Sequence, residues 1–212
     1  MNALYTQILD NKRQELLPLF GAFKEKFYLA GGTALALMLG HRDSVDFDFF
    51  SQEEFSTEEL YVKIQSVFKE KSIKKIQEEE NTLTILIDGI KISFFSYPYK
   101  TLDEFTDTKY LRIASLKDIG CMKLSTITSR STIKDYVDLY YILKQKNLDE
   151  LLAGCSEKFP QLDKMLILKS LVYFDDIETI SLKFMKGKEI NIEEVKNYFE
   201  NLVKEYLKSI QD

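Results

Sequence analysis

A strand that runs directly into a glycine turn and a helix is the feature that most limits the fold of this chain. Residues 27–30 (Phe-Tyr-Leu-Ala) form a short apolar run that enters Gly31 and Gly32. Thr33 can cap a helix over Ala34–Leu39, and Gly40 can end it. Because glycines let the backbone approach an anion and a helix N-terminus directs free N–H groups at it, this turn is a candidate phosphate-binding loop. Many strand–helix turns contain Gly-Gly, however, and no Walker-type Gly-x-x-x-x-Gly-Lys-Ser/Thr follows.

The next strand-like run, over residues 45–50, alternates acidic and apolar side chains. Alternation puts Val45, Phe47 and Phe49 on one face, and it puts Asp46 and Asp48 on the other. Residues two apart on a strand are separated by roughly 6.6 Å at their Cα atoms. Two carboxylates at that distance repel by about 2–3 kcal/mol at an effective dielectric near 20, and a divalent cation between them turns the repulsion into attraction. The alternative is that both acids face water on an edge strand.

The residues available as ligands favour magnesium over zinc. His41 is the single histidine, and Cys121 and Cys155 are not spaced as a Cys-x-x-Cys pair. A metal would therefore be held by oxygen ligands, which suits a hard cation such as Mg²⁺. With no disulfide framework, we expect two core thiols in a reducing cytoplasm.

No segment of the sequence predicts a membrane or secretory location. The start, Met1–Gln7, lacks a basic stretch leading into an apolar run. The most apolar segment, Tyr28–Leu39, contains two glycines and is shorter than the roughly 20 residues that a spanning helix needs. We expect a cytoplasmic protein.

The remaining pattern predicts an α+β chain whose second half is helical. Asp88-Gly89 separates two strand-like runs and is a strong two-residue hairpin signal. Pro98 and the polar run to Asp107 suggest a boundary, so we expect domains over residues 1–100 and 101–212. The helices expected in the first half are 3–18 and 58–70, the later strands are 73–76, 82–87 and 90–95, and the helices of the second half are 115–129, 133–145, 148–158, 162–174 and 192–210.

One lysine of the second half lies on an apolar helix face. Lys123 falls on the same stripe as Ile119 and Ile127, so it either contacts a phosphate in a cleft or extends past the rim of the core into solvent. Arg130 lies seven residues further on and could extend a basic strip. Lys134 and Asp138 are four residues apart and could form an exposed ion pair worth only tenths of a kcal/mol.

A local excess of positive charge surrounds this helix. Between Lys109 and Lys134 there are six basic residues and one acid, Asp118, a composition that could attract phosphate or a polynucleotide. The net charge of −5 opposes a generally basic surface, and a solvated helix face explains the same residues equally well.

Together these segments resemble the AbiEii/AbiGii-type nucleotidyltransferase family, the toxin half of many toxin–antitoxin and abortive-infection pairs. The resemblance is carried by residues 28–37 (Tyr-Leu-Ala-Gly-Gly-Thr-Ala-Leu-Ala-Leu) and 40–50 (Gly-His-Arg-Asp-Ser-Val-Asp-Phe-Asp-Phe-Phe). A second block comprises residues 116–124, Arg130 and residues 134–139. The likeness covers roughly residues 25–145.

The resemblance implies a mixed sheet with flanking helices, followed by a helical domain that closes a nucleotide cleft. It implies Mg²⁺-dependent transfer of a nucleoside monophosphate from an NTP to an acceptor hydroxyl, on an RNA 3′ end such as that of tRNA or on a protein. A cognate antitoxin is the implied partner. A separate hypothesis is that the acidic C-terminal helices, which lie outside the resemblance, bind this antitoxin. By position, the metal ligands are Asp46 and Asp48, the further catalytic residues are Lys123 and Asp138, and the nucleotide-binding residues are Gly31, Gly32, Thr33, Arg42, Ser44 and Arg130.

One position departs from the fuller members of this fold. They carry a third carboxylate on a neighbouring strand, where this chain has Ser93, and Asp88 lies in the hairpin turn and cannot replace it. The alternative function is therefore a nucleotide-binding or partner-binding module with impaired catalysis.

Overall fold

The computed structural model describes residues 4–178 and 181–210, which form two compact units. The first contains the chain up to Lys100 together with Glu104–Ser115, and the second contains Thr101–Asp103 and the chain from Leu116 onward. This division differs from the predicted boundary at residue 101, because two short strands within Glu104–Ser115 pair into the sheet of the first unit.

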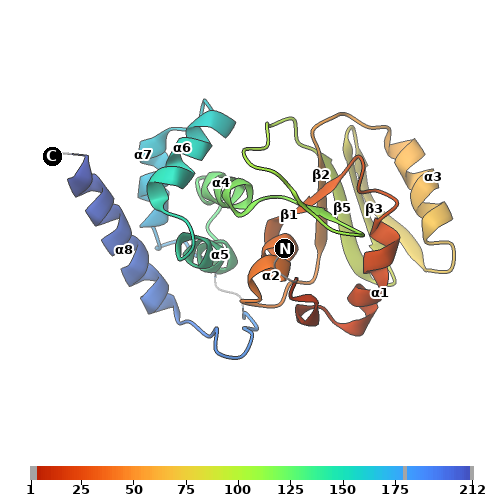
Figure 1. Cartoon of the computed structure of the whole chain (residues 1–212), viewed down its shortest axis with the longest axis horizontal. Helices are drawn as coiled ribbons and strands as arrows, with labels where there is room; N and C mark the ends of the chain where they lie inside the picture. The colour runs from red at the N-terminus through yellow and green to blue at the C-terminus, as the bar shows by residue number, and fades with distance from the viewer. Residues whose placement is uncertain (1–3, 179–180, 211–212) are drawn as a thin grey trace. The chain divides into compact units, whose positions relative to one another are not determined.

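The first unit is a seven-stranded mixed sheet in the order β3-β4-β5-β2-β1-β7-β6 (Figure 1). Strand β2 pairs with β5 in parallel and β1 pairs with β7 in parallel, whereas the other neighbours are antiparallel. The strands are β1 (Tyr28–Ala30), β2 (Phe47–Ser51), β3 (Ile73–Glu79), β4 (Thr82–Ile87), β5 (Ile90–Ser96), β6 (Thr106–Asp107) and β7 (Arg112–Ile113). Its helices are the 3₁₀ helix η1 (Thr6–Ile8), α1 (Asn11–Phe20), α2 (Gly31–Leu39) and α3 (Thr57–Val67).

Aromatic packing buries one face of the central strands. The Phe20 ring of α1 lies 4.8 Å from Phe47 and 4.9 Å from Phe49, measured between ring centroids. Phe94 of β5 stacks on Phe49 at 5.2 Å. The predicted alternation is confirmed from Phe47 onward. It is wrong for Val45, which precedes the strand and is 51% exposed, with its carbonyl accepting a hydrogen bond from a side chain of α1.

Several element boundaries differ from the prediction for local reasons. The expected helix over residues 3–18 is broken, because Asp10 caps a new helix by accepting a hydrogen bond from the backbone N–H of Arg13. The helix after the glycine turn begins at Gly31, so Thr33 lies in its first turn and is not its cap. It ends at Gly40 in the left-handed conformation, as predicted.

The hairpin between β4 and β5 is confirmed. Asp88 and Gly89 have φ values of 49° and 84°, and positive φ at both central residues is typical of a type I′ turn. Strand β3 continues to Glu79, three residues beyond the predicted run, as an exposed edge strand rich in charge.

The second unit is helical, as predicted. Its helices are α4 (Leu116–Ile127), α5 (Ile133–Leu143), α6 (Leu148–Lys158), α7 (Lys164–Leu171) and α8 (Ile192–Ser209). In the part of the chain that the structure describes, no helix combines the length and apolar character needed to cross a membrane.

A buried ion pair organises the start of this unit. The Asp118 carboxylate of α4 lies 2.8 Å from Lys158 Nζ of α6, and the two side chains are 2% and 1% exposed. Asp118 also accepts hydrogen bonds from the backbone N–H groups of Leu102 and Asp103. Residues 101–103 are therefore held to the helical unit by one buried carboxylate.

Replacing Lys158 with Met tests this arrangement. The change leaves the Asp118 carboxylate buried without its cation, so we expect the free energy of unfolding to fall by about 3–5 kcal/mol. Lys196→Met, which breaks the exposed Lys196–Glu193 pair of α8, should change it by less than about 0.5 kcal/mol. Urea denaturation followed by circular dichroism measures both, and equal losses in the two variants would contradict the prediction.

Candidate functional site

The glycine turn of the first unit lies directly against an acidic side chain. Gly31 has φ +73°, a left-handed conformation that favours glycine. A Cβ atom built on Gly31 would lie 3.3 Å from Oδ2 of Asp48. In the sheet, Ala30 at the end of β1 is the register partner of Asp48 on β2. The strand pairing therefore brings the carboxylate to the point where the chain leaves β1 and enters the turn.

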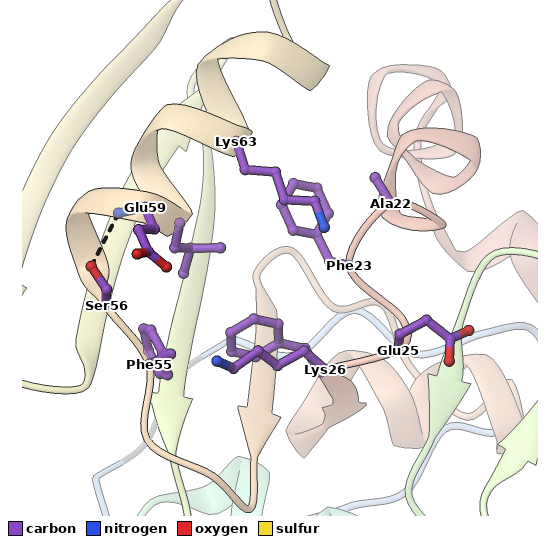
Figure 2. Close-up of a pocket in the computed structure, with 10 residues that line it drawn as sticks. Ala22, Phe23, Glu25, Lys26, Phe55, Ser56, Glu59 and Lys63 are labelled. Carbon is purple, nitrogen blue, oxygen red and sulfur yellow. Dashed lines mark hydrogen bonds between the residues drawn. The ribbon is translucent and has the colours of Figure 1, made fainter.

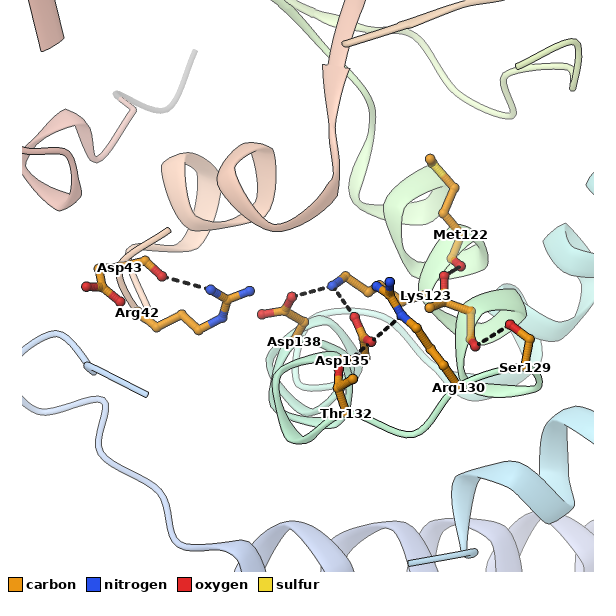
Figure 3. A network of polar contacts seen from close by, with 10 residues as sticks. Arg42, Asp43, Met122, Lys123, Ser129, Arg130, Thr132, Asp135 and Asp138 are labelled. Carbon is orange, nitrogen blue, oxygen red and sulfur yellow. Dashed lines mark hydrogen bonds and ion pairs between the residues drawn. The ribbon is translucent and has the colours of Figure 1, made fainter. Parts of the chain in front are cut away.

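The second glycine packs against the segment that precedes β2. A Cβ atom on Gly32 would lie 2.9 Å from Nη2 of Arg42 and 3.3 Å from Oγ of Ser44. Arg42 is 5% exposed, and its Nη1 donates a hydrogen bond of 2.8 Å to the carbonyl of Asp43 (Figure 3). A side chain at this position would displace the Arg42 guanidinium, so glycine allows the guanidinium to approach the backbone closely.

Thr33 connects the first turn of α2 to the acidic segment. Its hydroxyl donates a hydrogen bond to the backbone carbonyl of Asp46 and lies 2.7 Å from the hydroxyl of Ser44. Its side chain thus fixes the approach to β2, where the sequence predicted a helix cap. Asp46 contributes its backbone carbonyl to this hydrogen bond. Asp46 and Asp48 are both partly exposed.

Six of the predicted residues of the first unit, together with the backbone of Asp46, therefore lie together. The side chains and turns that meet are those of Gly31, Gly32, Thr33, Arg42, Ser44 and Asp48. Within residues 4–178 and 181–210, no group of three or more His, Cys, Asp or Glu side chains is arranged to hold a metal ion.

Ser93 occupies the sheet position beside Asp48. The two residues are register partners on the parallel strands β2 and β5. Ser93 is 1% exposed, and its hydroxyl lies 3.3 Å from that of Thr84 on β4. The neutral hydroxyl groups of Ser93 and Thr84 therefore lie on the strands next to Asp48, at the same level of the sheet.

A second cluster of predicted residues lies in the helical unit (Figure 3). Nζ of Lys123 on α4 lies 2.7 Å from Oδ1 of Asp135 and 2.6 Å from Oδ2 of Asp138, both on α5. The two carboxylates are fully buried, and Lys123 is 7% exposed. The interpretation of Lys123 as a lysine that extends into solvent is wrong. The exposed Lys134–Asp138 pair is also wrong, because Asp138 is buried and contacts Lys123.

Asp135 is the functional candidate that the sequence reasoning missed. It accepts hydrogen bonds of 2.6 Å from the Thr132 hydroxyl and 3.3 Å from Nε of Arg130, whose side chain is 57% exposed. The available signal was its spacing of three residues from Asp138, which places both acids on one helix face opposite a lysine expected on an apolar stripe.

Mutual attraction sets the charge states of this cluster. Burial alone would lower the pKa of Lys123, but the charges of Asp138 and Asp135 outweigh it and hold the pKa above the ordinary lysine value. Burial would raise the pKa of Asp135, but the Lys123 charge outweighs it and holds the pKa below the usual carboxyl value. The lysine is therefore a permanent cation at neutral pH.

The predicted basic strip over residues 109–134 includes one lysine that is not exposed. Lys109 and Arg112 belong to the first unit, whereas Lys123 is buried between two acids of the second. Arg130 contacts Asp135 and does not extend a row of cations above Lys123. The charge count along the sequence did not reveal that the Lys123 charge is enclosed by two carboxylates.

Both cysteines are core thiols, as expected. Cys121 and Cys155 are buried and free. A hydrogen bond with Cys155, together with burial, raises the pKa of the Cys121 thiol. Cys121 is therefore not a reactive nucleophile at neutral pH.

An apolar pocket of about 170 Å³ lies elsewhere in the first unit, beside α3 (Figure 2). Phe23, Phe27 and Phe55 line it, and charged side chains including Glu59 and Lys63 surround them. Lys63 Nζ lies 5.3 Å from the centroid of the Phe23 ring. None of the predicted site residues lines this pocket.

Comparison with known structures defines the class of fold. JHP933 from Helicobacter pylori is similar with a TM-score of 0.56 and 17% identity, over 99% of this chain and 100% of that chain. The nucleotidyltransferase toxin MenT4 from Mycobacterium tuberculosis H37Rv is similar with a TM-score of 0.57 and 14% identity, over 90% of this chain and 81% of that chain. The fold is that of the nucleotidyltransferases, with a mixed sheet followed by C-terminal helices.

Sequence comparison then gives the family. Residues 19–205 match the model of the nucleotidyl transferase AbiEii toxin of type IV toxin–antitoxin systems. An uncharacterized protein of Aquifex aeolicus is 38% identical over 187 residues, which cover 86% of this chain and 89% of that protein. This chain belongs to the AbiEii nucleotidyltransferase toxin family, and the predicted resemblance is confirmed.

Replacing Asp135 with Asn tests the buried cluster. At pH 7 we expect a loss of about 1.5–3 kcal/mol in the free energy of unfolding, the range for hydrogen bonds to charged groups. The folded pKa of Asp135 lies below its unfolded value of about 3.9. Its contribution is therefore complete above the unfolded pKa and disappears as the pH falls through the folded pKa.

Urea denaturation at pH 7, 5, 4 and 3 should show the wild type converging on Asp135→Asn at the acidic end. Glu200→Gln, on an exposed position of α8, is the matched control and should follow the wild type at pH 7. A difference between the wild type and Asp135→Asn that stays constant across this pH range would contradict the assigned charge state.

Proposed function

We propose that this chain transfers a nucleoside monophosphate from an NTP to an acceptor hydroxyl and releases pyrophosphate. The observation that carries the proposal is the position of the Asp48 carboxylate beside Gly31 at the N-terminus of α2, where a Cβ added to Gly31 would lie 3.3 Å from Oδ2 of Asp48. A helix N-terminus attracts phosphate, and a carboxylate beside it is a ligand for the cation that accompanies a triphosphate. Neither group alone suggests nucleotidyl transfer, but the two groups side by side do.

The donor set fits Mg²⁺. Asp48 offers its carboxylate at a position where a side chain on Gly31 would crowd it, and Asp46 precedes it by two residues. When bound, the ion would neutralise phosphate charge and polarise the phosphorus that is attacked.

The other residues of the first unit position the triphosphate. In this proposal the first turn of α2, with Gly32 and Thr33, supplies backbone N–H groups to the phosphates. The buried Arg42 guanidinium beside Gly32 adds a fixed positive charge. Ser44 supports Thr33 through the hydroxyl contact of 2.7 Å. Catalysis then consists mostly of orientation and charge neutralisation.

The helical unit contributes a cation whose orientation is fixed. We assign Lys123 a phosphate contact, Asp138 the role of holding its amine, and Arg130 a further contact with the nucleotide. The ion pairs of 2.6 and 2.7 Å support this assignment, because a lysine held by two buried acids cannot change rotamer freely. Since its pKa is raised, Lys123 acts by charge and not as a general base.

A labelled-nucleotide assay tests the transfer. The protein is incubated with Mg²⁺, tRNA or cell extract, and each NTP labelled at either the α- or the γ-phosphate. We expect the acceptor to take label from the α-phosphate only, and Asp48→Asn and Asp46→Asn each to reduce it by at least about 100-fold. Glu59→Gln, a residue of the pocket in Figure 2, should leave the rate unchanged.

Two results of this assay would reject the proposal. One is label from the γ-phosphate, which indicates phosphoryl transfer. The other is equal labelling by wild type and Asp48→Asn. The class of the labelled molecule, whether RNA or protein, identifies the acceptor.

A second candidate function follows from Ser93. Because a buried serine stands beside Asp48 in register, the chain could bind NTP without activating an acceptor hydroxyl. In that case calorimetry detects NTP binding by the wild type while no pyrophosphate is released with any acceptor. Release of pyrophosphate that depends on Asp48 eliminates this candidate.

Membership of a toxin family supports a protein partner. We propose that an antitoxin encoded beside this gene binds the chain or opposes its activity. Co-expression of the two genes should restore growth that expression of the wild type alone inhibits. If the wild type does not inhibit growth, or if Asp48→Asn inhibits it equally, the toxin role is rejected.

A further inference from the structure

A second cavity of the first unit lies at the opposite end of the central strands from the glycine turn. It measures about 310 Å³ and is lined by residues that include Tyr28, at the start of β1, and Ser51, at the end of β2. Phe105 and Arg112 come to it from the segment that carries β6 and β7. None of these residues belongs to the candidate site. We refer to this cavity as the base pocket.

Two aromatic rings and a guanidinium pack together along one wall of the base pocket. The rings of Tyr28 and Phe105 lie 4.9 Å apart between centroids, and the Arg112 guanidinium lies 4.4 Å from the centroid of Phe105. Tyr28 also stacks on Phe50 at 6.0 Å. Aromatic rings and guanidinium planes are the surfaces on which unpaired bases stack in single-stranded nucleic acids.

The rest of the lining offers both donors and acceptors of hydrogen bonds. Gln52 provides an amide, Glu25 and Glu53 provide carboxylates, and Lys26 provides an ammonium. The two carboxylates are balanced by the ammonium of Lys26 and the guanidinium of Arg112, so neither sign of charge predominates in the lining. It suits a neutral ring whose edge carries both N–H and carbonyl groups, as a nucleobase does.

The base pocket shares a sheet face with Asp48. Tyr28 pairs with Phe50, and Ala30 pairs with Asp48, two residues along the same strands. Residues two apart on a strand point to the same face, at a spacing of roughly 6.6 Å. The rings of Tyr28 and Phe50 therefore lie on the same face of the sheet as the Asp48 carboxylate, on the side of it away from the glycine turn.

We propose that the base pocket binds an unpaired nucleobase of a polynucleotide acceptor, close to the nucleotide whose hydroxyl is modified. The assignment of the base to an acceptor rests on the proposed function, because it assumes that the chain transfers a nucleotide to that acceptor. The binding itself is independent of catalysis and can be measured without it. The base that binds could also come from the incoming NTP. A protein acceptor carries no nucleobase and would not occupy this pocket.

The test uses the full-length chain carrying Asp48→Asn, so that binding is separated from transfer. A fluorescein-labelled, unstructured single-stranded RNA is titrated and followed by anisotropy, with the same RNA as a duplex for comparison. We expect the single strand to bind, and Phe105→Leu to weaken it by about 5- to 150-fold, since that is the measured range for one stacked base. Gln52→Ala, at an exposed position, should weaken RNA binding less than Phe105→Leu does. Phe105→Tyr keeps an aromatic ring and should bind RNA as the chain with Phe105 does.

Lys63→Gln is the matched control, because it removes one positive charge from the pocket in Figure 2 and leaves the base pocket intact. Thermal unfolding identifies any variant that fails to fold, and Gln52→Ala then carries the test. Unchanged affinity in both Phe105→Leu and Gln52→Ala overturns the proposal, as does equal affinity for the duplex or no binding of the single strand.

Steady-state kinetics with Asp48 intact distinguish the two sources of the base. If Phe105→Leu raises KM for the RNA acceptor and leaves KM for NTP unchanged, the base comes from the acceptor. A rise in KM for NTP alone overturns the acceptor assignment. Binding of RNA without transfer of label would reject the proposed function while leaving the base pocket supported.

Discussion

The antiparallel pairing of β1 with β2 is the constraint on which the candidate site depends. Its register places Ala30 opposite Asp48, so the chain enters the glycine turn beside the carboxylate. Hydrophobic packing fixes this register, because Phe47 and Phe49 are buried beneath Phe20. A slip of one residue would turn Asp48 into the aromatic core and expose the phenylalanines. The aromatic face of the sheet thus determines the position of the acidic residue on the other face.

Local patterns in the sequence predicted the parts of the fold that have local causes. The turn at Asp88-Gly89 needs positive φ at both residues, and the helices of the second unit have clear apolar stripes. Strands β6 and β7, each two residues long, are too short to show a period. They join the sheet through the pairing of β7 with β1. The role of Thr33 was missed because its hydrogen-bond partner, the carbonyl of Asp46, lies thirteen residues away.

Burying charged side chains in the helical unit costs desolvation free energy, and their ion pairs offset that cost. Lys123 is held by two acids and Lys158 by one. Asp135 also contacts Arg130 and Thr132, and Asp118 also accepts hydrogen bonds from two backbone N–H groups. Apolar side chains would stabilise such positions as well or better, so these pairs are weak evidence of a purely structural purpose. For Lys123, the raised pKa and the two fixed ion pairs give a cation of defined position, a property that phosphate binding uses and simple packing does not require.

The row that contains Asp48 also limits how an acceptor hydroxyl could be activated. Ser93 and Thr84 contact each other at 3.3 Å and neither accepts a proton at neutral pH, so the neighbouring strands offer no third carboxylate as a base. Transfer in the proposed site must then depend more on the alignment of the acceptor with the nucleotide than on proton abstraction. Alignment can supply several kcal/mol when the reacting groups are held in place. Transfer that depends on alignment requires a surface that holds the acceptor in place. The proposed base pocket, on the same sheet face as Asp48, would be such a surface.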